Sequence, residues 1–289
     1  MLPFTFQGTG VALATPFSGD GSVDYKALSQ LVEFVIKGGV DYLVALGTTA
    51  ETPTLTSAEK SAILRHIVQV AGNAVPVVAG VGGNDTLSVV KKVESTDFSG
   101  VSALLSVTPY YNRPSQQGLI EHYSRVADVS PVPVILYNVP SRTGVNLAAE
   151  TTLKLAGHPR IAAIKEASGN LTQMMELIKG APAGFVVISG DDYLAFPMAV
   201  LGASGVISVA ANVVPAQVSK MMRAALGFRI PEARELHYEL TGLFSTLFAE
   251  GNPVGVKAAL SILGIAHNQL RLPLVSGSDQ LLASLRQQL

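Results

Sequence analysis

Short apolar runs rich in β-branched residues alternate along the chain with longer segments in which apolar residues recur every three or four positions. The first pattern is typical of buried strands, and the second is typical of helices that pack one face on a core. Eight runs fit the strand pattern: 10–16, 42–47, 75–81, 103–108, 134–139, 161–165, 185–190 and 205–209. Eight strand–helix units in order predict a parallel (β/α)₈ TIM barrel of the α/β class.

A doubly wound open sheet is the alternative arrangement of the same units. Its usual phosphate-binding fingerprint is missing, because residues 80–85 (GVGGND) lack the final glycine. Two predicted helix starts carry local signals. Thr56 with Glu59 fits a capping box, and Asn170 with Gln173 resembles one.

After Ala210 the pattern is wholly helical, over residues 215–226, 231–250, 253–265 and 278–288. The first of these segments would complete the barrel, and the other three form a C-terminal helical appendix. We therefore expect a catalytic barrel over residues 1–226 and a helical domain over residues 227–289. No stretch rich in glycine, serine or charge separates them, so the helical domain should pack on the barrel.

Composition narrows the range of partners and chemistries. Hydrophobic residues make up 48% of the chain and charged residues only 14%, which suggests that part of the outer surface is buried against other subunits. A net charge of -1 and a pI of about 6.5 argue against nucleic acid or a membrane surface as a partner. The chain has no cysteine, which excludes disulfides, thiolate metal sites and a cysteine nucleophile.

Residues 193–219 carry no charge and are long enough in principle to span a bilayer. Pro197, Gly202 and Pro215 interrupt this stretch at intervals that fit helix, turn, strand and helix. Residues 1–10 lack the basic start and the apolar run of a signal peptide. We therefore expect a cytoplasmic protein without a membrane span.

Lys165 stands at the carboxyl end of the sixth predicted strand, where the working residues of such barrels gather. Side chains alternate along a strand, so an inward Lys165 implies inward Ala163 and Ala167, which leave room for a substrate. A poorly hydrated lysine favours its neutral form, which can attack a ketone and form an imine that serves as an electron sink. On this strand alone, a lysine that packs its stem and reaches solvent remains an alternative.

Tyr137 ends the fifth predicted strand, which should neighbour the sixth. Inward side chains at matching heights on adjacent strands can touch, and a phenol beside an imine-forming lysine can shuttle protons. An ordinary core tyrosine is the alternative. The tyrosine and the lysine together favour the catalytic interpretation.

Three loops add candidate binding groups. Thr48 and Thr49 follow the second strand, where backbone N–H groups and hydroxyls suit a small carboxylate. Arg142 lies in the loop after the fifth strand and offers a planar fork for a second carboxylate. A simple turn and a solvated loop arginine are the alternatives. Tyr110 and Tyr111 follow the fourth strand and mark an interface or a ligand rim.

We predict no metal site. Asp191 and Asp192 follow the seventh strand without a third ligand nearby, and helix capping explains them better. The five histidines are scattered, and none forms a helical two-histidine motif.

Four separated segments now resemble one known family, the dihydrodipicolinate (4-hydroxy-tetrahydrodipicolinate) synthases. They are residues 47–51 (GTTAE), 108–114 (TPYYNRP), 137–144 (YNVPSRTG) and 164–170 (IKEASGN). The resemblance covers nearly the whole chain, including residues 189–192 (SGDD) and 205–208 (GVIS). Four motifs in the same order are far more specific than any one of them.

The resemblance implies a Schiff-base-forming lyase of lysine and diaminopimelate biosynthesis that needs no metal or organic cofactor. Lys165 would form an imine with pyruvate, and the derived enamine would attack L-aspartate 4-semialdehyde. A proton relay would comprise Tyr137, Thr49 and Tyr111, the last borrowed from a neighbouring subunit of a homotetramer built as a dimer of dimers. The implied substrate-binding groups are Thr48 and Thr49 for the pyruvate carboxylate, Arg142 for the semialdehyde carboxylate, and the backbones of Gly190 and Ile207.

Two departures from the family pattern stand out. Ala50 replaces the usual second glycine of the loop after strand two, and an alanine there is strained if the position needs a positive φ. The second departure lies at the positions that bind inhibitory lysine in feedback-regulated members, where an acidic side chain is absent and Lys60 adds a like charge. We therefore expect weak or no inhibition by lysine. The matching positions are Asn84, Tyr110, Thr52, Pro53, Ser57, Lys60 and Ser88.

Two rival functions remain. N-acetylneuraminate lyases and 2-keto-3-deoxy sugar acid aldolases share the lysine and the tyrosine, but they usually have Ser-Thr after strand two and lack the arginine. Thr48, Thr49 and Arg142 therefore favour the synthase. A non-catalytic binding protein on an old barrel predicts that the lysine or the tyrosine is lost, and both are present.

Overall fold

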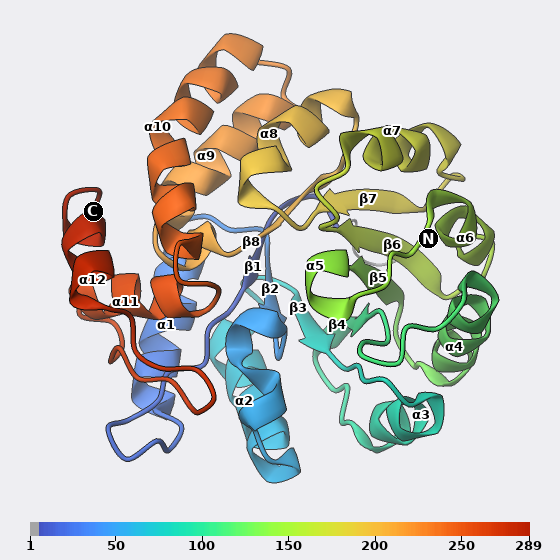
Figure 1. Cartoon of the computed structure of the whole chain (residues 1–289), viewed down its shortest axis with the longest axis horizontal. Helices are drawn as coiled ribbons and strands as arrows, with labels where there is room; N and C mark the ends of the chain where they lie inside the picture. The colour runs from blue at the N-terminus through green and yellow to red at the C-terminus, as the bar shows by residue number, and fades with distance from the viewer. Residues whose placement is uncertain (1–5) are drawn as a thin grey trace.

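The computed structural model describes residues 6–289 and shows a closed barrel of eight parallel strands in sequence order (Figure 1). The barrel closes where β1 pairs with β8. This confirms the predicted (β/α)₈ fold. The strands are β1 (Gly8–Ala12), β2 (Tyr42–Ala45), β3 (Val77–Gly80), β4 (Val101–Val107), β5 (Val134–Asn138), β6 (Ile161–Glu166), β7 (Val186–Ser189) and β8 (Gly205–Ser208).

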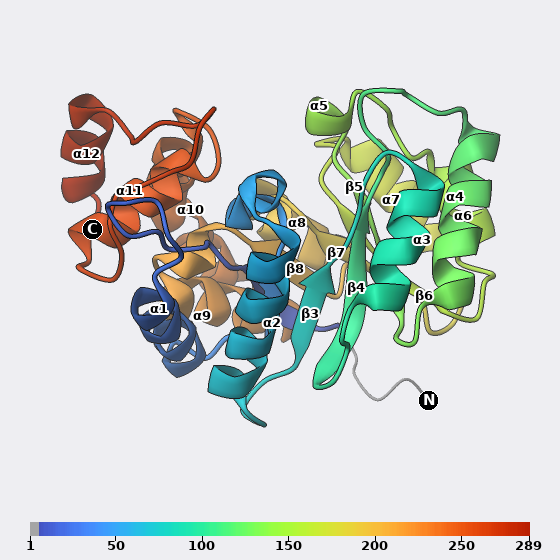
Figure 2. The same ribbon diagram turned by 90° about the horizontal axis from the view of Figure 1, so that it is seen from below.

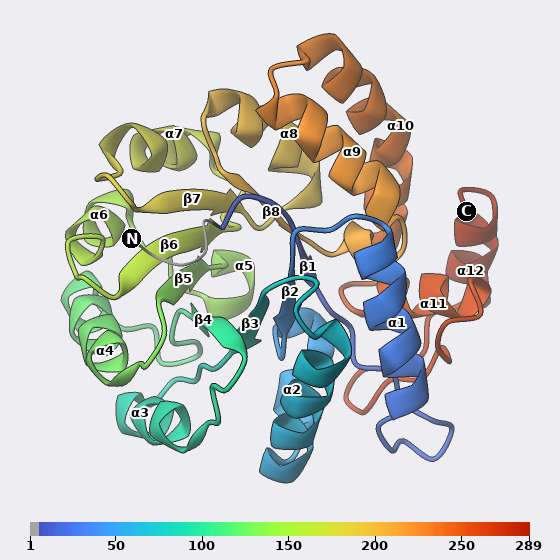
Figure 3. The same ribbon diagram turned by 180° about the vertical axis from the view of Figure 1, so that it is seen from behind.

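Helices surround the strands on all sides, as the view from behind shows (Figure 3). Short 3₁₀ turns η1 (Thr48–Ala50), η2 (Thr52–Thr54) and η3 (Ala210–Asn212) interrupt the loops at the carboxyl ends of β2 and β8. The barrel helices are α1 (Tyr25–Lys37), α2 (Ser57–Ala71), α3 (Thr86–Ser95), α4 (Gln116–Val129), α5 (Pro140–Thr143), α6 (Ala149–Leu155), α7 (Leu171–Gly180), α8 (Asp192–Leu201) and α9 (Pro215–Leu226).

Alternation along the strands separates two cores. On β6, Ala163 points into the barrel, where it joins Tyr137, Ile188 and Ile207. Its neighbour Ile164 points outward and packs with apolar residues of the helical layer. The period of two therefore decides which residues of a strand can reach the barrel mouth.

The first strand differs from its prediction. It starts at Gly8 and ends at Ala12, whereas the apolar run predicted residues 10–16. After Leu13 the chain leaves the sheet, and the Ala14 N–H donates to the Asn212 side chain instead of to a strand. Leu13, Ala14 and Phe17 are buried in the core beside the barrel although they lie beyond the end of the strand. The chain therefore stays apolar after strand pairing has ended, which is why the predicted strand was too long.

Both predicted helix starts exist, but only one is a capping box. The Thr56 side chain accepts from the Glu59 N–H, and the Glu59 carboxylate accepts from the Thr56 N–H. At α7 the Asn170 side chain accepts from the Gln173 N–H, as expected. The Gln173 amide does not return to the cap, however. It donates to the buried Glu166 carboxylate at 3.0 Å, a stronger acceptor.

The uncharged stretch 193–219 divides among α8, β8, η3 and α9, as its glycines and prolines predict. Among residues 6–289, no helix is both long and apolar enough to cross a membrane.

Three further helices follow α9: α10 (Ile230–Phe248), α11 (Val254–Ile262) and α12 (Asp279–Arg286). Helix α10 packs against α8 and α9, while α11 contacts η3 and α12. These helices lie at the same end of the barrel as α5 (Figure 2). The predicted boundary at residues 226 and 227 falls in the short connection before α10, and the division into two domains stays a prediction.

Candidate active site

Lys165 and Tyr137 are direct partners in the parallel pairing of β5 and β6. The Lys165 Nζ lies 4.4 Å from the centroid of the Tyr137 ring. Both side chains are buried at the barrel mouth, with exposed fractions of 5% and 6%. The structure therefore brings together the two residues on which the sequence argument depends, and it excludes the alternative of a Lys165 that reaches open solvent.

Gly190, just after β7, makes room for the Lys165 stem. A Cβ added to Gly190 would lie 2.7 Å from the Ala167 Cβ and 3.0 Å from the Lys165 Cε. Atoms this close cannot coexist without a shift, so the glycine leaves the volume that the lysine occupies. Its N–H donates to the Glu166 carbonyl at 2.7 Å, which fixes the strand end beside the lysine.

Glu166 follows the lysine in sequence but points away from it, toward the helical layer, because side chains alternate along a strand. Its buried carboxylate accepts from the Asn138 side chain at 3.0 Å, from the Gln173 side chain at 3.0 Å and from the Ser168 N–H at 2.7 Å. These donors stabilise a charge that burial would otherwise penalise. The network anchors the ends of β5 and β6, and the sequence reasoning did not find it.

Thr48 and Thr49 lie in the turn η1, directly after β2. The Thr49 side chain is buried, and its Oγ1 accepts from the Asn252 side chain at 3.1 Å. Ala50 is the last residue of η1 and does not have a positive φ. The left-handed residues are Leu46 (φ 56°) and Glu51 (φ 52°), on either side of the turn. The strain considered for Ala50 therefore does not arise.

Arg142 lies in the short helix α5, which Pro140 starts. Its Nη2 donates to the Asn252 carbonyl at 3.2 Å. Asn252, between α10 and α11, thus contacts both Thr49 and Arg142. Sequence reasoning missed this residue, because a polar residue in a helix connection carries no signal that it will contact side chains 110 and 203 positions earlier in the chain.

A cavity of about 560 Å³ joins these groups. Its lining includes six of the predicted site residues: Thr48, Thr49, Tyr137, Arg142, Lys165 and Gly190. The C-terminal helical segment contributes Phe244, Phe248 and Asn252 to the same lining. These residues close one side of the cavity, so the appendix is part of the site.

Two predicted site residues are not in this lining. Ile207 is fully buried in the barrel interior. Tyr111 is 89% exposed, with a left-handed backbone (φ 73°). Such exposure is compatible with a tyrosine that acts on another subunit, and its role stays a prediction.

The two aspartates after β7 have structural partners. Asp191 caps α8 by accepting from the Tyr193 N–H at 2.8 Å. Asp192 is buried and accepts from the Ser208 hydroxyl at 2.5 Å and from the Ala210 N–H at 3.0 Å, and burial raises its pKa. In the described part of the chain, no group of three or more His, Cys, Asp and Glu residues could hold a metal ion.

The predicted regulatory positions are only partly together in one chain. Thr52, Ser57 and Lys60 line a second cavity, of about 350 Å³, between α2 and α3. Lys92 lines it too, and burial together with the like charge of Lys92 lowers the pKa of Lys60. The remaining four positions, Pro53, Asn84, Ser88 and Tyr110, are not in this lining.

A buried amine beside a phenol, open to a cavity with an arginine and two threonines, can form an imine with a keto acid and hold carboxylates around it. On a closed (β/α)₈ barrel, this arrangement defines an imine-forming lyase. A family model agrees. The model of the Dihydrodipicolinate synthetase family matches residues 5–289, and the chain belongs to this family.

Individual relatives support this assignment over nearly the full length. The chain is 52% identical to a 4-hydroxy-tetrahydrodipicolinate synthase of Parabacteroides distasonis, over 95% of this chain and 93% of the relative. The crystal structure of a dihydrodipicolinate synthase from Aquifex aeolicus is 44% identical, covers 98% of this chain and 96% of that one, and superposes with a TM-score of 0.94. A dihydrodipicolinate synthase from Acinetobacter baumannii, crystallised in complex with pyruvate, is 40% identical, covers 98% of both chains and has a TM-score of 0.96.

Proposed function

We propose that the protein is a 4-hydroxy-tetrahydrodipicolinate synthase, which condenses pyruvate with L-aspartate 4-semialdehyde in lysine and diaminopimelate biosynthesis. The observation that carries the proposal is the contact between Lys165 and Tyr137 at a cavity lined also by Thr48, Thr49 and Arg142. The family assignment supports it, because the relatives that match most of the chain carry this name.

In the first stage, the neutral Lys165 amine attacks the keto carbon of pyruvate, and the carbinolamine loses water to give the imine. Tyr137, whose ring lies beside this amine, moves protons to and from the carbinolamine oxygen. The turn of Thr48 and Thr49 binds the pyruvate carboxylate through N–H groups and hydroxyls. Loss of a methyl proton then gives the enamine.

In the second stage, the enamine carbon attacks the aldehyde carbon of the semialdehyde. Arg142, which lines the same cavity, binds the carboxylate of this substrate through its guanidinium fork. A relay of Tyr137, Thr49 and Tyr111 of a neighbouring subunit supplies the proton to the new alkoxide. The substrate's amino group then attacks the imine carbon, which closes the ring and releases Lys165. The backbones of Gly190 and Ile207 complete the pocket.

This mechanism needs no metal and no organic cofactor, because the imine itself accepts the electrons. We infer a homotetramer, a dimer of dimers, since Tyr111 lies in open solvent in one chain and needs a partner subunit to reach a site. The biosynthetic role also supports a cytoplasmic location.

The regulatory proposal is that free lysine inhibits weakly or not at all. Lys60 and Lys92 line the cavity that also contains Thr52 and Ser57, and neither forms an ion pair with an acidic side chain in the described residues. Arg65 lines this cavity too, and Asp97 is the single acidic residue among the described residues of the lining, so a ligand with an ammonium group would meet net positive charge there.

Turnover tests the proposed function. The purified protein should consume pyruvate and L-aspartate 4-semialdehyde together, and it should not cleave N-acetylneuraminate or a 2-keto-3-deoxy sugar acid at a comparable rate. Faster cleavage of a sugar acid than synthesis from the semialdehyde would reject the proposal in favour of the rival aldolases.

A further inference from the structure

A fully buried ion pair joins the catalytic turn to the C-terminal helical segment. The Lys257 Nζ on α11 lies 2.5 Å from the Glu51 Oε1, and both side chains are completely buried. Lys257 also donates to the Gln269 carbonyl at 2.8 Å and lies 3.8 Å from the centroid of the Phe17 ring. Glu51 immediately follows the η1 turn that contains Thr48 and Thr49.

Both carboxylate oxygens of Glu51 contact groups of the C-terminal segment. Its second oxygen, Oε2, accepts from the Arg271 N–H at 3.0 Å. The backbone of Glu51 is left-handed (φ 52°), a conformation that a residue with a Cβ adopts only when its surroundings enforce it. The two contacts from α11 and the loop after it therefore add to the local hydrogen bonds that hold this chain reversal, from the Glu51 N–H to the Thr48 carbonyl and from the Thr52 hydroxyl to the Gly47 carbonyl.

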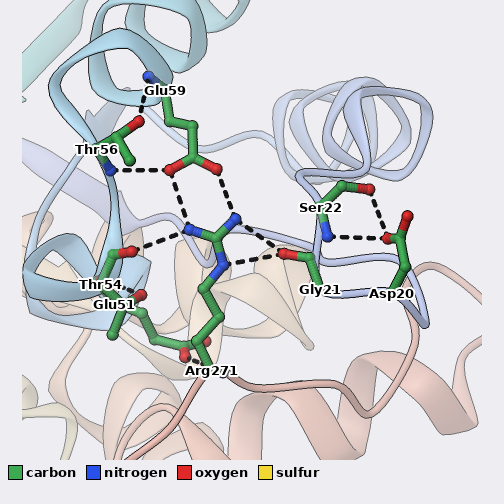
Figure 4. Close-up of polar contacts among 8 residues, drawn as sticks. All are labelled: Asp20, Gly21, Ser22, Glu51, Thr54, Thr56, Glu59 and Arg271. Atoms are coloured by element: carbon green, nitrogen blue, oxygen red, sulfur yellow. Dashed lines mark hydrogen bonds and ion pairs between the residues drawn. The ribbon is translucent and has the colours of Figure 1, made fainter.

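The Arg271 side chain connects the C-terminal segment to the next turn, η2, and to the start of α2 (Figure 4). Its guanidinium donates twice to the Glu59 carboxylate, twice to the Gly21 carbonyl and once to the Thr54 carbonyl. All five N–H donors are used. Glu59 closes the capping box with Thr56 at the same time, so η2 and the start of α2 are fixed to the C-terminal segment as well.

Stability alone does not explain such a buried pair, because well-packed apolar side chains of the same volume are often as stable or more so. A buried polar network with all its hydrogen bonds made holds the segments that it joins in one arrangement, because other arrangements would leave buried charges unpaired. The positions fixed here are Glu51 and Thr54, which both follow the threonine turn. Asn252, from the same segment, fixes the turn from inside the cavity through Thr49.

We propose that Glu51, Lys257 and Arg271 are positioning residues that hold the Thr48–Thr49 turn in the geometry that binds the pyruvate carboxylate. The C-terminal helices thereby set the affinity for the first substrate, although neither Lys257 nor Arg271 lines the cavity. This inference rests on the proposed function, in which the turn binds pyruvate.

The test uses a double variant, Glu51→Gln with Lys257→Met, which removes both charges and leaves no unpaired buried ion. The readout is the pyruvate concentration that gives half-maximal borohydride trapping, which needs no second substrate. We expect this concentration to rise tenfold or more, while the KM for the semialdehyde stays within about twofold. A partly unfolded sample would lower the amount trapped but would leave the half-saturating concentration unchanged.

A matched control is Arg229→Gln with Glu232→Gln, which removes an exposed ion pair at the start of α10. It should trap pyruvate as the parent does. If the double variant at Glu51 and Lys257 does not fold, Arg271→Lys serves instead, because it keeps the charge and loses the fork. It should raise the half-saturating pyruvate concentration severalfold.

The two proposals fail in different ways. A parent protein that traps no pyruvate would overturn the proposed function and this inference with it. A parent that traps pyruvate, with an unchanged half-saturating concentration in the folded variant, would overturn the positioning role alone.

Discussion

Lys165 and Tyr137 face each other across neighbouring strands, with the amine nitrogen 4.4 Å from the centre of the phenol ring. Parallel pairing of β5 and β6 creates this contact, because the two residues occupy the same register at the carboxyl ends of their strands. The buried amine is the proposed nucleophile, and the phenol beside it lines the same cavity. Most of the chemistry inferred for this protein depends on that pair.

Tyr137→Phe removes the hydroxyl and keeps the ring. Because general acid–base catalysis typically contributes about 10²–10⁴-fold, we expect kcat to fall by at least about 10²-fold. Stability should change little, since no hydrogen bond of the Tyr137 hydroxyl within the described chain is lost. Steady-state kinetics and thermal unfolding measure the two effects. A kcat within a few-fold of the parent would remove the tyrosine from the mechanism.

Arg142→Ala should weaken the binding of the semialdehyde and leave pyruvate trapping largely intact. A hydrogen bond to a charged group contributes about 1.5–3 kcal/mol, so the KM for the semialdehyde should rise roughly 10–150-fold. Because Arg142 also donates to the Asn252 carbonyl, a structural role is the competing explanation. Equal loss of trapping and of semialdehyde use would support that structural role.

Gly190→Ala should impair catalysis more than folding. The new Cβ would lie 3.0 Å from the Lys165 Cε and 2.7 Å from the Ala167 Cβ, so the lysine stem must shift. We expect the rate of pyruvate trapping to fall at least tenfold. Gly19→Ala is a suitable control, because nothing lies within 4 Å of its added Cβ. Equal trapping rates in the two variants would show that the lysine tolerates the displacement.

Free lysine should not inhibit the enzyme in the sub-millimolar range. Lys60 and Lys92 place two cations at the cavity between α2 and α3, and burial with the Lys92 charge already lowers the pKa of Lys60. A lysine titration at saturating and half-saturating substrates measures the effect. Half-maximal inhibition at sub-millimolar lysine would reject the proposal.

The sequence predicts the fold and the centre of the site because both depend on local patterns. Alternation along β5 and β6 places Tyr137 and Lys165 inward and Glu166 outward, and the structure agrees. The order of the strands makes β5 and β6 neighbours, which brings the two catalytic candidates together.

Contacts between distant segments could not be predicted in this way. Asn252 reaches Thr49, and Lys257 reaches Glu51, only because the C-terminal helices pack at the same end of the barrel as the β2–α2 connection. Neither residue belongs to a periodic pattern or a turn motif that would single it out. The extent of β1 was wrong for a related reason, since burial continues to Phe17 after strand pairing has ended.

Borohydride reduction in the presence of pyruvate, followed by peptide mass mapping, tests the central claim most directly. The account predicts a single reduced pyruvyl adduct on Lys165 and none when Lys165→Ala replaces the parent. An adduct on another lysine, or active enzyme that yields no adduct at all, would contradict the assignment of Lys165 as the imine-forming nucleophile.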